Sequence, residues 1–325
     1  MRNNFWKNKR VLVTGYEGFL GSHLTKALID KGARVTGLDI ETRRKETILN
    51  GEFKKISIIK GSVEDFKLIC SILEKKKIDF VFHLAAAAII GESLENPLTT
   101  FSTNIAGTWN ILEACRKNLK VKGIIVASSD KAYGSKNILP YKEEASLEGN
   151  HTYDASKSCA DLLAYTYYHT YNIPVCVTRC GNIFGPGDYN FSRIVPDSLR
   201  SIFAKKILKI RSDGKFTRDY VYVDDIVYAY MLLAEKMDKN KLYGEAFNFS
   251  YESPVNVIDL IKEIEKEAKT KVKYKILNQA KYEIKHQYLC ARKAKKILCW
   301  KPKYSLKSGL KETIPWYRNC LQKKS

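Results

Sequence analysis

Tyr153 and Lys157 stand four residues apart in a stretch that is predicted to be a helix. Residues at this spacing share one face of a helix, so the phenol and the ammonium would be neighbours. A free tyrosine titrates near pH 10, and a base that works near neutrality needs a pKa roughly three units lower, or about 4 kcal/mol. One positive charge about 4 Å away at an effective dielectric constant of 20 supplies that much. The pair is a candidate proton-transfer site, and the alternative is two ordinary residues on a helix surface.

Three further polar residues, Ser129, Asp130 and Lys131, follow an apolar stretch over residues 123–127 that is typical of a buried strand. Ligands bind at the carboxyl ends of strands in parallel sheets. This position therefore makes the three side chains candidates for chemistry. For Asp130 the alternative is an ordinary loop carboxylate.

Glycines connect the first predicted strand, residues 10–14, to a helix over residues 22–31. Gly15, Gly18 and Gly21 are spaced so that the chain can turn tightly and its backbone N–H groups can approach a pyrophosphate. A strand followed by glycines and then by a helix predicts a dinucleotide site, although a purely structural turn has the same pattern.

Asp39 ends the second predicted strand, residues 33–39. A carboxylate there can accept both hydroxyls of an adenosine ribose and repels a 2′-phosphate, which favours NAD over NADP. Arg43 and Arg44 follow closely and are able to hold a phosphate, so this preference is moderate.

Predicted strands and helices continue to alternate along the chain. Strands are expected over residues 56–61, 80–86, 123–127 and 175–180, with helices over 63–76, 97–119 and 152–171. This alternation predicts an α/β fold with a Rossmann-type doubly wound parallel sheet. We expect a dinucleotide-binding domain over residues 1–181, to which 219–240 returns, and a smaller, partly discontinuous α/β substrate-binding lobe over 182–325. His83 lies in an apolar strand and is expected to be a core histidine.

Composition places the chain among ordinary globular proteins, with 45% hydrophobic and 28% charged residues in 325. The net charge of +21 comes from lysines spread along the chain, so a solvated surface is favoured over nucleic-acid binding. No apolar run is long enough to span a membrane, and no secretory signal is seen. The eight cysteines are scattered and without metal-binding spacing. We expect a cytoplasmic protein with no metal site.

Several stretches together resemble one known family. They are residues 14–21 (TGYEGFLG), 83–86 (HLAA), 128–134 (SSDKAYG), 153–157 (YDASK) and 218–225 (RDYVYVDD), in this order. Across nearly its whole length the chain resembles the extended short-chain dehydrogenase/reductases that act on nucleotide-activated sugars. Within them it is similar to the nucleotide-sugar 4,6-dehydratases. Residues 153–161, 174–185, 190–193 and 283–288 most resemble the CDP-glucose 4,6-dehydratase branch.

The resemblance implies a closed redox cycle with bound NAD. Tyr153, supported by Lys157, would take the proton of the sugar 4-hydroxyl, to which Ser129 hydrogen-bonds, while hydride leaves C4. Water would then be eliminated across C5 and C6 and the hydride returned to C6. Asp130 would protonate the departing 6-hydroxyl. Lys131 stands where many relatives have a glutamate as the C5 base, so it is either that base or an electrostatic stabiliser of the enolate.

Binding residues also follow from the resemblance. Those for the cofactor are Gly15, Gly18, Phe19, Leu20, Gly21, Asp39, Ser62, Val63, Leu84, Ala85, Ala86, Tyr153 and Lys157. Those for the sugar diphosphate are Asn182, Asn190, Arg193 and Arg218. Ser62 departs from the family, in which an aspartate is frequent.

The expected partners are a nucleotide-diphosphate sugar and further copies of the same chain, as a dimer or tetramer. The resemblance suggests CDP-glucose, or a GDP-sugar such as GDP-N-acetylglucosamine, and a role in surface glycan synthesis. A 4-epimerase or reductase on the same scaffold is the first alternative, which the Asp130-Lys131 pair disfavours. The second is a non-catalytic nucleotide-sugar-binding protein, which the presence of serine, tyrosine and lysine disfavours.

Overall fold

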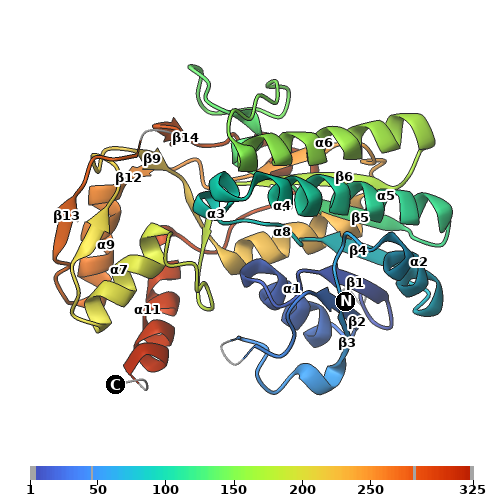
Figure 1. The fold of residues 1–325 in the computed structure, drawn as a ribbon, viewed down its shortest axis with the longest axis horizontal. Coiled ribbons are helices and arrows are strands. Elements are labelled where there is room, and N and C mark those ends of the chain that lie inside the picture. Colours follow the sequence, from blue (N-terminus) through green and yellow to red (C-terminus); the bar gives the residue numbers. More distant parts are fainter. Residues whose placement is uncertain (1–4, 45–46, 281–282, 323–325) are drawn as a thin grey trace.

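A parallel sheet of seven strands forms the centre of the larger part of the molecule (Figure 1). The structure, a computed structural model, describes residues 5–44, 47–280 and 283–322. The strands are β1 (Arg10–Thr14), β2 (Arg34–Asp39), β3 (Ile56–Lys60), β4 (Phe80–His83), β5 (Gly123–Ala127), β6 (Val175–Cys180) and β11 (Ala246–Phe249). Their order is β11-β6-β5-β4-β1-β2-β3. The chain reverses its direction of winding between β1 and β4, which opens a crevice at their carboxyl ends.

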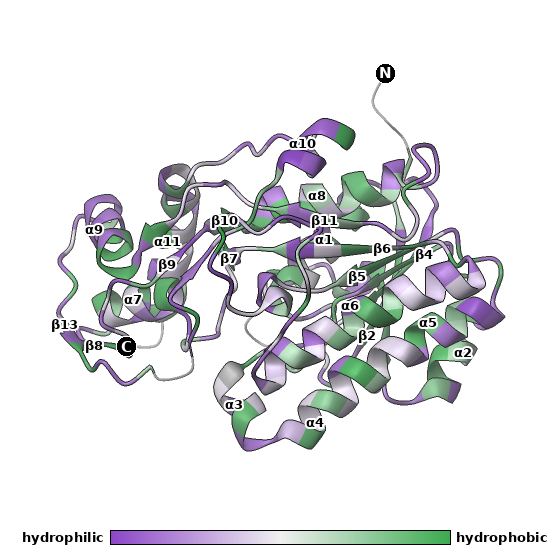
Figure 2. Ribbon diagram, turned by 90° about the horizontal axis from the view of Figure 1, so that it is seen from above, coloured by the Kyte–Doolittle hydropathy of each residue, from purple (hydrophilic) through white to green (hydrophobic). Residues whose placement is uncertain are grey.

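Helices cover both faces of this sheet. On one face lie α1 (Phe19–Asp30) and α8 (Val223–Lys236), and on the other α2 (Phe66–Lys75), α5 (Gly107–Lys117) and α6 (Thr152–Tyr171). The alternation of side chains along β1 divides the core, because Val11 and Val13 join the cluster under α1 and α8, whereas Leu12 joins the cluster under α2 and α5. Figure 2 shows hydrophobic residues concentrated in β4, β5 and β6 between the helices. The expected Rossmann-type doubly wound sheet is confirmed.

The smaller lobe lies beside the carboxyl ends of the strands, on the left in Figure 1. It contains α7 (Ile194–Phe203), α9 (Val257–Ala268) and α11 (Leu306–Gln322). Its strands pair as β8 (Leu208–Ile210) with β13 (Tyr274–Ile276), and as β12 (Val255–Asn256), β9 (Thr217–Arg218) and β14 (His286–Gln287) in one small sheet. Two further strands, β7 (Asn182–Phe184) and β10 (Tyr220–Tyr222), pair with each other.

Two segments after residue 181 lie on the large sheet. Helix α8, within the segment 219–240, packs against α1 and the sheet. Strand β11 pairs with β6 at the sheet edge, and α10 (Arg292–Ile297) contacts it. The sequence-based boundary assigns β11 and α10 to the smaller lobe, whereas the structure attaches both to the sheet. A four-residue strand with an asparagine at its third position carries too weak a pattern to reveal this.

The expected single helix over residues 97–119 is divided. It consists of α4 (Pro97–Phe101), a wide π-type turn at Ser102–Ala106, and α5, and a separate short helix, α3 (Ile90–Glu95), precedes it. Asn104 in the wide turn accepts a hydrogen bond from the backbone N–H of Ala87 (2.7 Å) and donates one to Ser156 Oγ (2.9 Å). The turn therefore ties the loop after β4 to α6, as such turns frequently do near functional sites.

No helix in the described part of the chain is long and apolar enough to cross a membrane. Among the same residues, no group of three or more histidine, cysteine, aspartate or glutamate side chains is placed to hold a metal ion.

Candidate active site

One large cavity, of about 1840 Å³, lies between the carboxyl ends of the sheet strands and the smaller lobe. Every predicted site residue lines it. They are Gly15, Gly18, Phe19, Leu20, Gly21, Asp39, Ser62, Val63, Leu84, Ala85, Ala86, Ser129, Asp130, Lys131, Tyr153, Lys157, Asn182, Asn190, Arg193 and Arg218. The cavity begins at the crevice between β1 and β4 and continues into the smaller lobe, so it offers room for a dinucleotide and a second ligand.

The glycine turn has the geometry of a pyrophosphate site. Helix α1 begins after Gly18 without a side-chain cap, so the N–H groups of its first turn are left to bind an anion. Gly15 has φ +69° and lies so close to the loop after β4 that a Cβ would approach the backbone of Ala85 to 2.9 Å. A Cβ on Gly21 would lie 1.9 Å from the carbonyl oxygen of Gly15. Both positions therefore require glycine. The glycine turn and the start of α1 fit the pyrophosphate of NAD.

Asp39, at the end of β2, lines the cavity. Its carboxylate accepts a hydrogen bond from the backbone N–H of Glu17 (3.2 Å) and lies 3.9 Å from the Arg44 guanidinium. Burial raises the pKa of Asp39, and the hydrogen bond from Glu17 opposes this.

Glu17 was missed in the sequence. Its buried carboxylate accepts hydrogen bonds from the Tyr16 hydroxyl (2.5 Å) and from the backbone N–H groups of Arg43 and Arg44. It holds the loop after Asp39 against the glycine turn. Its position between Gly15 and Gly18 was a possible sequence signal. A carboxylate at such a position is expected to be exposed, and only the position of the loop after Asp39 in the structure shows that it is buried.

Tyr153 and Ser129 face each other in the cavity, and the Ser129 hydroxyl forms a hydrogen bond that lowers the pKa of Tyr153. Burial has the larger effect and raises the pKa of Tyr153 to about 12, with the nearby Arg193 guanidinium lowering it. The Nζ atom of Lys157 lies 6.0 Å from the centre of the Tyr153 ring and donates to the carbonyl oxygen of Ala127 (2.8 Å). The Lys157 ammonium is thus directed toward the carbonyl of Ala127 and is not the close partner of the phenol that the four-residue spacing predicts, and the role of the pair stays a prediction.

Lys157 is itself unusual. Burial lowers its pKa to about 8, and Asp161 opposes this. Asp161 is bound in turn by Arg179 through two hydrogen bonds of 2.7 and 2.8 Å. The carboxylate that supports the Lys157 ammonium is thus held by a buried guanidinium on β6.

Asp130 and Lys131 lie next to Tyr153. Both belong to the single helical turn Asp130–Tyr133 that follows β5, and Asp130 is 4% exposed. The Ser129 hydroxyl donates to Asp130 Oδ1 (3.1 Å), and Lys131 Nζ lies 3.5 Å from Asp130 Oδ2. Burial lowers the pKa of Lys131, and Arg218 acts in the same direction while Asp130 and Asp154 oppose it. Burial thus shifts this amine toward the neutral form that a base requires.

Asp154 was also missed, although it follows Tyr153 directly. It lines the cavity, is 5% exposed and has its pKa raised to about 6 by burial, against the effects of Lys131 and His151. A buried carboxyl with a raised pKa beside other titratable groups is typical of functional sites.

The smaller lobe contributes cations to the same cavity. Arg193 contacts Asp188 (3.1 Å) at the start of α7 and is 41% exposed. Arg218, on β9, donates to the carbonyl oxygens of Ile284 and Lys285 and is buried. Asn182 hydrogen-bonds Tyr220, whereas the Asn190 side-chain oxygen is used by Ser192. Two guanidinium groups in one cleft suit a diphosphate.

His83 has the core role expected. Its two ring nitrogens lie 2.9 Å from Thr14 Oγ1 and 3.1 Å from Thr108 Oγ1, and burial lowers its pKa to about 3. It links β1, β4 and α5 behind the cavity.

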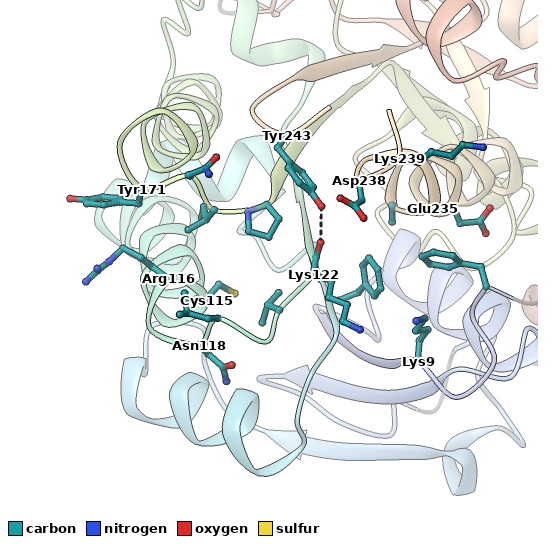
Figure 3. A pocket seen from close by; sticks show the side chains of 18 residues that line it. Lys9, Cys115, Arg116, Asn118, Lys122, Tyr171, Glu235, Asp238, Lys239 and Tyr243 are labelled. Atoms are coloured by element: carbon teal, nitrogen blue, oxygen red, sulfur yellow. Dashed lines mark hydrogen bonds between the residues drawn. The ribbon is translucent and has the colours of Figure 1, made fainter. Parts of the chain in front are cut away.

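A second cavity, of about 820 Å³, lies at the opposite end of the sheet (Figure 3). Its polar groups largely have partners within the protein. Arg116 is bound by Glu113 through two hydrogen bonds, and the Tyr243 hydroxyl donates to the carbonyl oxygen of Lys122 (3.4 Å). Its lining, among the described residues, includes no predicted site residue.

Comparisons with known proteins agree with this geometry. A sequence model of the family described as GDP-mannose 4,6 dehydratase matches residues 12–313. The chain is 31% identical to UDP-glucuronate 4-epimerase of Thermodesulfobacterium geofontis, over 96% of this chain and 97% of that protein. It is 33% identical to dTDP-D-glucose 4,6-dehydratase of Dictyostelium discoideum, over 79% of this chain and 61% of that protein.

Among solved structures, UDP-glucuronic acid 4-epimerase from Bacillus cereus in complex with UDP-glucuronic acid and NAD has a TM-score of 0.87 and 25% sequence identity. The match covers 96% of this chain and 99% of that one. Dehydratases and epimerases are thus similar to this chain to a comparable degree.

Proposed function

Because the chain belongs to the family described as GDP-mannose 4,6 dehydratase, we propose that it is an NAD-dependent nucleotide-sugar 4,6-dehydratase. The net reaction removes water from a nucleotide-diphosphate hexose and leaves a 4-keto-6-deoxy sugar. The observation that carries this proposal is the Asp130-Lys131 pair, which lies in the cavity beside Ser129 and Tyr153. By the family resemblance, epimerases are expected to carry small or apolar residues at those two positions.

The residues divide the work of proton transfer between them. Tyr153 accepts the proton of the sugar 4-hydroxyl, and Ser129 holds the same oxygen. Bound NAD supplies the redox chemistry at C4 and C6. Lys157 adds a positive charge 6.0 Å from the centre of the Tyr153 ring, which favours the phenolate.

Elimination uses the neighbouring pair. Lys131 takes the proton from C5, which the 4-ketone has made acidic, and its lowered pKa supports this role. Asp130 gives a proton to the departing 6-hydroxyl. Its 3.1 Å contact with the hydroxyl of Ser129, the proposed ligand of the sugar 4-oxygen, supports this role.

Arg193 and Arg218 bind the diphosphate, and the nucleotide extends into the smaller lobe. CDP-glucose or a GDP-sugar such as GDP-N-acetylglucosamine is the proposed substrate, and surface glycan synthesis the proposed role. The family resemblance of residues 283–288 and 190–193 supports the CDP-glucose branch.

A 4-epimerase is the second candidate. The identity of 31% to a UDP-glucuronate 4-epimerase over nearly the whole chain favours it. In that case Asp130 and Lys131 would take no part in C5–C6 elimination, and a ketone intermediate would be reduced at C4 from its other face.

We further propose that the chain forms a homodimer through α4, α5 and α6. Large apolar side chains are exposed on these helices, with exposed fractions of 82% for Leu98, 45% for Trp109, 52% for Leu162 and 55% for Tyr165. Exposed apolar residues gathered on adjacent helices are typical of an interface.

The test is incubation of the purified protein with CDP-, GDP-, UDP- and dTDP-linked hexoses, followed by mass analysis of the products. A 4,6-dehydratase gives a product lighter by one water without net NADH formation. The Tyr153→Phe variant, which keeps the ring but lacks the hydroxyl, is expected to lose activity by a factor of about 10² to 10⁴. Full activity in this variant would exclude Tyr153 as the proton acceptor.

A further inference from the structure

Gln287 connects the smaller lobe to the turn that carries Asp130 and Lys131. It lies on β14, 156 positions from Lys131, and its side chain is fully buried (0% exposed). Its Nε2 donates to the backbone carbonyl oxygen of Asp130 (2.6 Å), and its Oε1 accepts a hydrogen bond from Lys131 Nζ. Because the first contact fixes the amide nitrogen, the amide oxygen must face the lysine.

The strand that carries Gln287 is attached to Arg218. In the pairing of β14 with β9, Gln287 is opposite Arg218. The Arg218 guanidinium also donates to the carbonyl oxygens of Ile284 and Lys285, just before β14. One small piece of the lobe therefore holds both a candidate diphosphate ligand and the acceptor for Lys131.

We propose that Gln287 is a positioning residue for elimination, which orients the Lys131 amine toward C5 and links its orientation to the diphosphate site at Arg218. This inference rests on the proposed dehydratase function and adds to it. Gln287 does not line the cavity among the described residues, so it acts through Lys131 and not on the sugar.

The step that Gln287 supports is proton transfer from C5. The C5–H proton moves to the lone pair of Lys131 Nζ, and the electron pair of that bond forms the C5–C6 double bond. The C6–O bond breaks with its electron pair on oxygen, which takes a proton from Asp130 and leaves as water. An amine aimed away from C5 by a lost hydrogen bond is unable to begin this sequence.

An amide suits this position better than a carboxylate. Around the Lys131 amine, Asp130 on the same turn and Asp154 on α6 favour the charged form, whereas burial and Arg218 on β9 favour the neutral form. Gln287 accepts a hydrogen bond without adding a further negative charge. A glutamate there would keep an acceptor for Lys131 but lose the donor to the Asp130 carbonyl, and its negative charge would hold the proton on Lys131 more firmly.

Two variants separate orientation from charge. Gln287→Ala is expected to form NADH on addition of the sugar nucleotide at nearly the wild-type rate, and to lower product release about a hundredfold. Exchange of the C5 hydrogen with D₂O, read by mass, is expected to fall by the same factor. Gln287→Glu keeps the acceptor for Lys131 Nζ, although it loses the donor to the Asp130 carbonyl, and is expected to retain elimination with its acidic limb moved to higher pH by about one unit or more.

The controls distinguish this inference from its premise. Wild-type enzyme that returns an epimer of unchanged mass overturns the proposed function and the inference with it. A wild-type dehydratase whose Gln287→Ala variant still releases product at the normal rate overturns the inference alone. Equal loss of NADH formation and of product in Gln287→Ala, or a Gln287→Glu pH profile identical to that of the wild type, shows a merely structural role and also overturns it.

Discussion

Replacing Asp154 by asparagine is expected to stabilise the folded protein. The carboxyl is 5% exposed and its pKa is raised from 3.8 to about 6, chiefly by burial. A difference of about two units between folded and unfolded states corresponds to about 3 kcal/mol. Because the folded-state pKa is the higher one, the stabilising contribution of the protonated Asp154 carboxyl in the wild type is fully present below the unfolded-state pKa of 3.8. It is lost as the pH rises through about 6.

The magnitude is an upper bound, because the new amide must find hydrogen-bond partners in the same place. At neutral pH the variant should gain up to about 3 kcal/mol in free energy of unfolding, and the gain should disappear by about pH 4. Urea unfolding of wild type and variant at several pH values measures the difference. Asp30→Asn, at an exposed residue of α1, is a matched control.

Equal stabilities at neutral pH, or a difference that does not depend on pH, would refute the reasoning about burial. The pH dependence of activity in Asp154→Asn gives a second test. Asp154 raises the pKa of Lys131, so its neutralisation should move the acidic limb of elimination to lower pH. A more stable enzyme with an altered pH profile is the outcome expected when a residue is kept for function.

Three further perturbations have definite outcomes. Lys131→Met should leave C4 oxidation intact, so that NADH accumulates while product falls by about 10² to 10⁴; unchanged turnover would exclude Lys131 from elimination. Asp39→Ala should raise the affinity for NADP relative to NAD by about tenfold or more, measured by fluorescence titration, since the repelling carboxylate is gone; an unaltered ratio would contradict its role. Leu162→Glu should give monomers in sedimentation experiments, whereas Leu119→Glu, at a loop residue 92% exposed, should not; dimers of both would place the interface elsewhere.

Much of the site was predictable because its signals are local. The glycines, Asp39 and the polar residues after β5 all stand at the carboxyl ends of strands, and parallel strands bring those ends together. The expected family, the Rossmann-type fold and NAD as the cofactor are confirmed by these features and by the comparisons. The roles of the individual site residues stay predictions.

Other features depend on contacts that no local pattern encodes. Gln287 stands on a strand of two residues, and its partners are 156 and 157 positions away. The direction in which Lys157 points is set by the carbonyl of Ala127, not by its spacing from Tyr153. For the same reason the sequence identifies a dehydratase or epimerase but separates the two only through Asp130 and Lys131.

The central claim is that a ketone made at C4 is used to expel water from C6. The most direct measurement is the mass of the product formed from each nucleotide hexose by the wild-type enzyme, with NADH followed in the same reaction. The account predicts a product lighter by one water and no net NADH. A product of unchanged mass with an inverted C4 centre would contradict it.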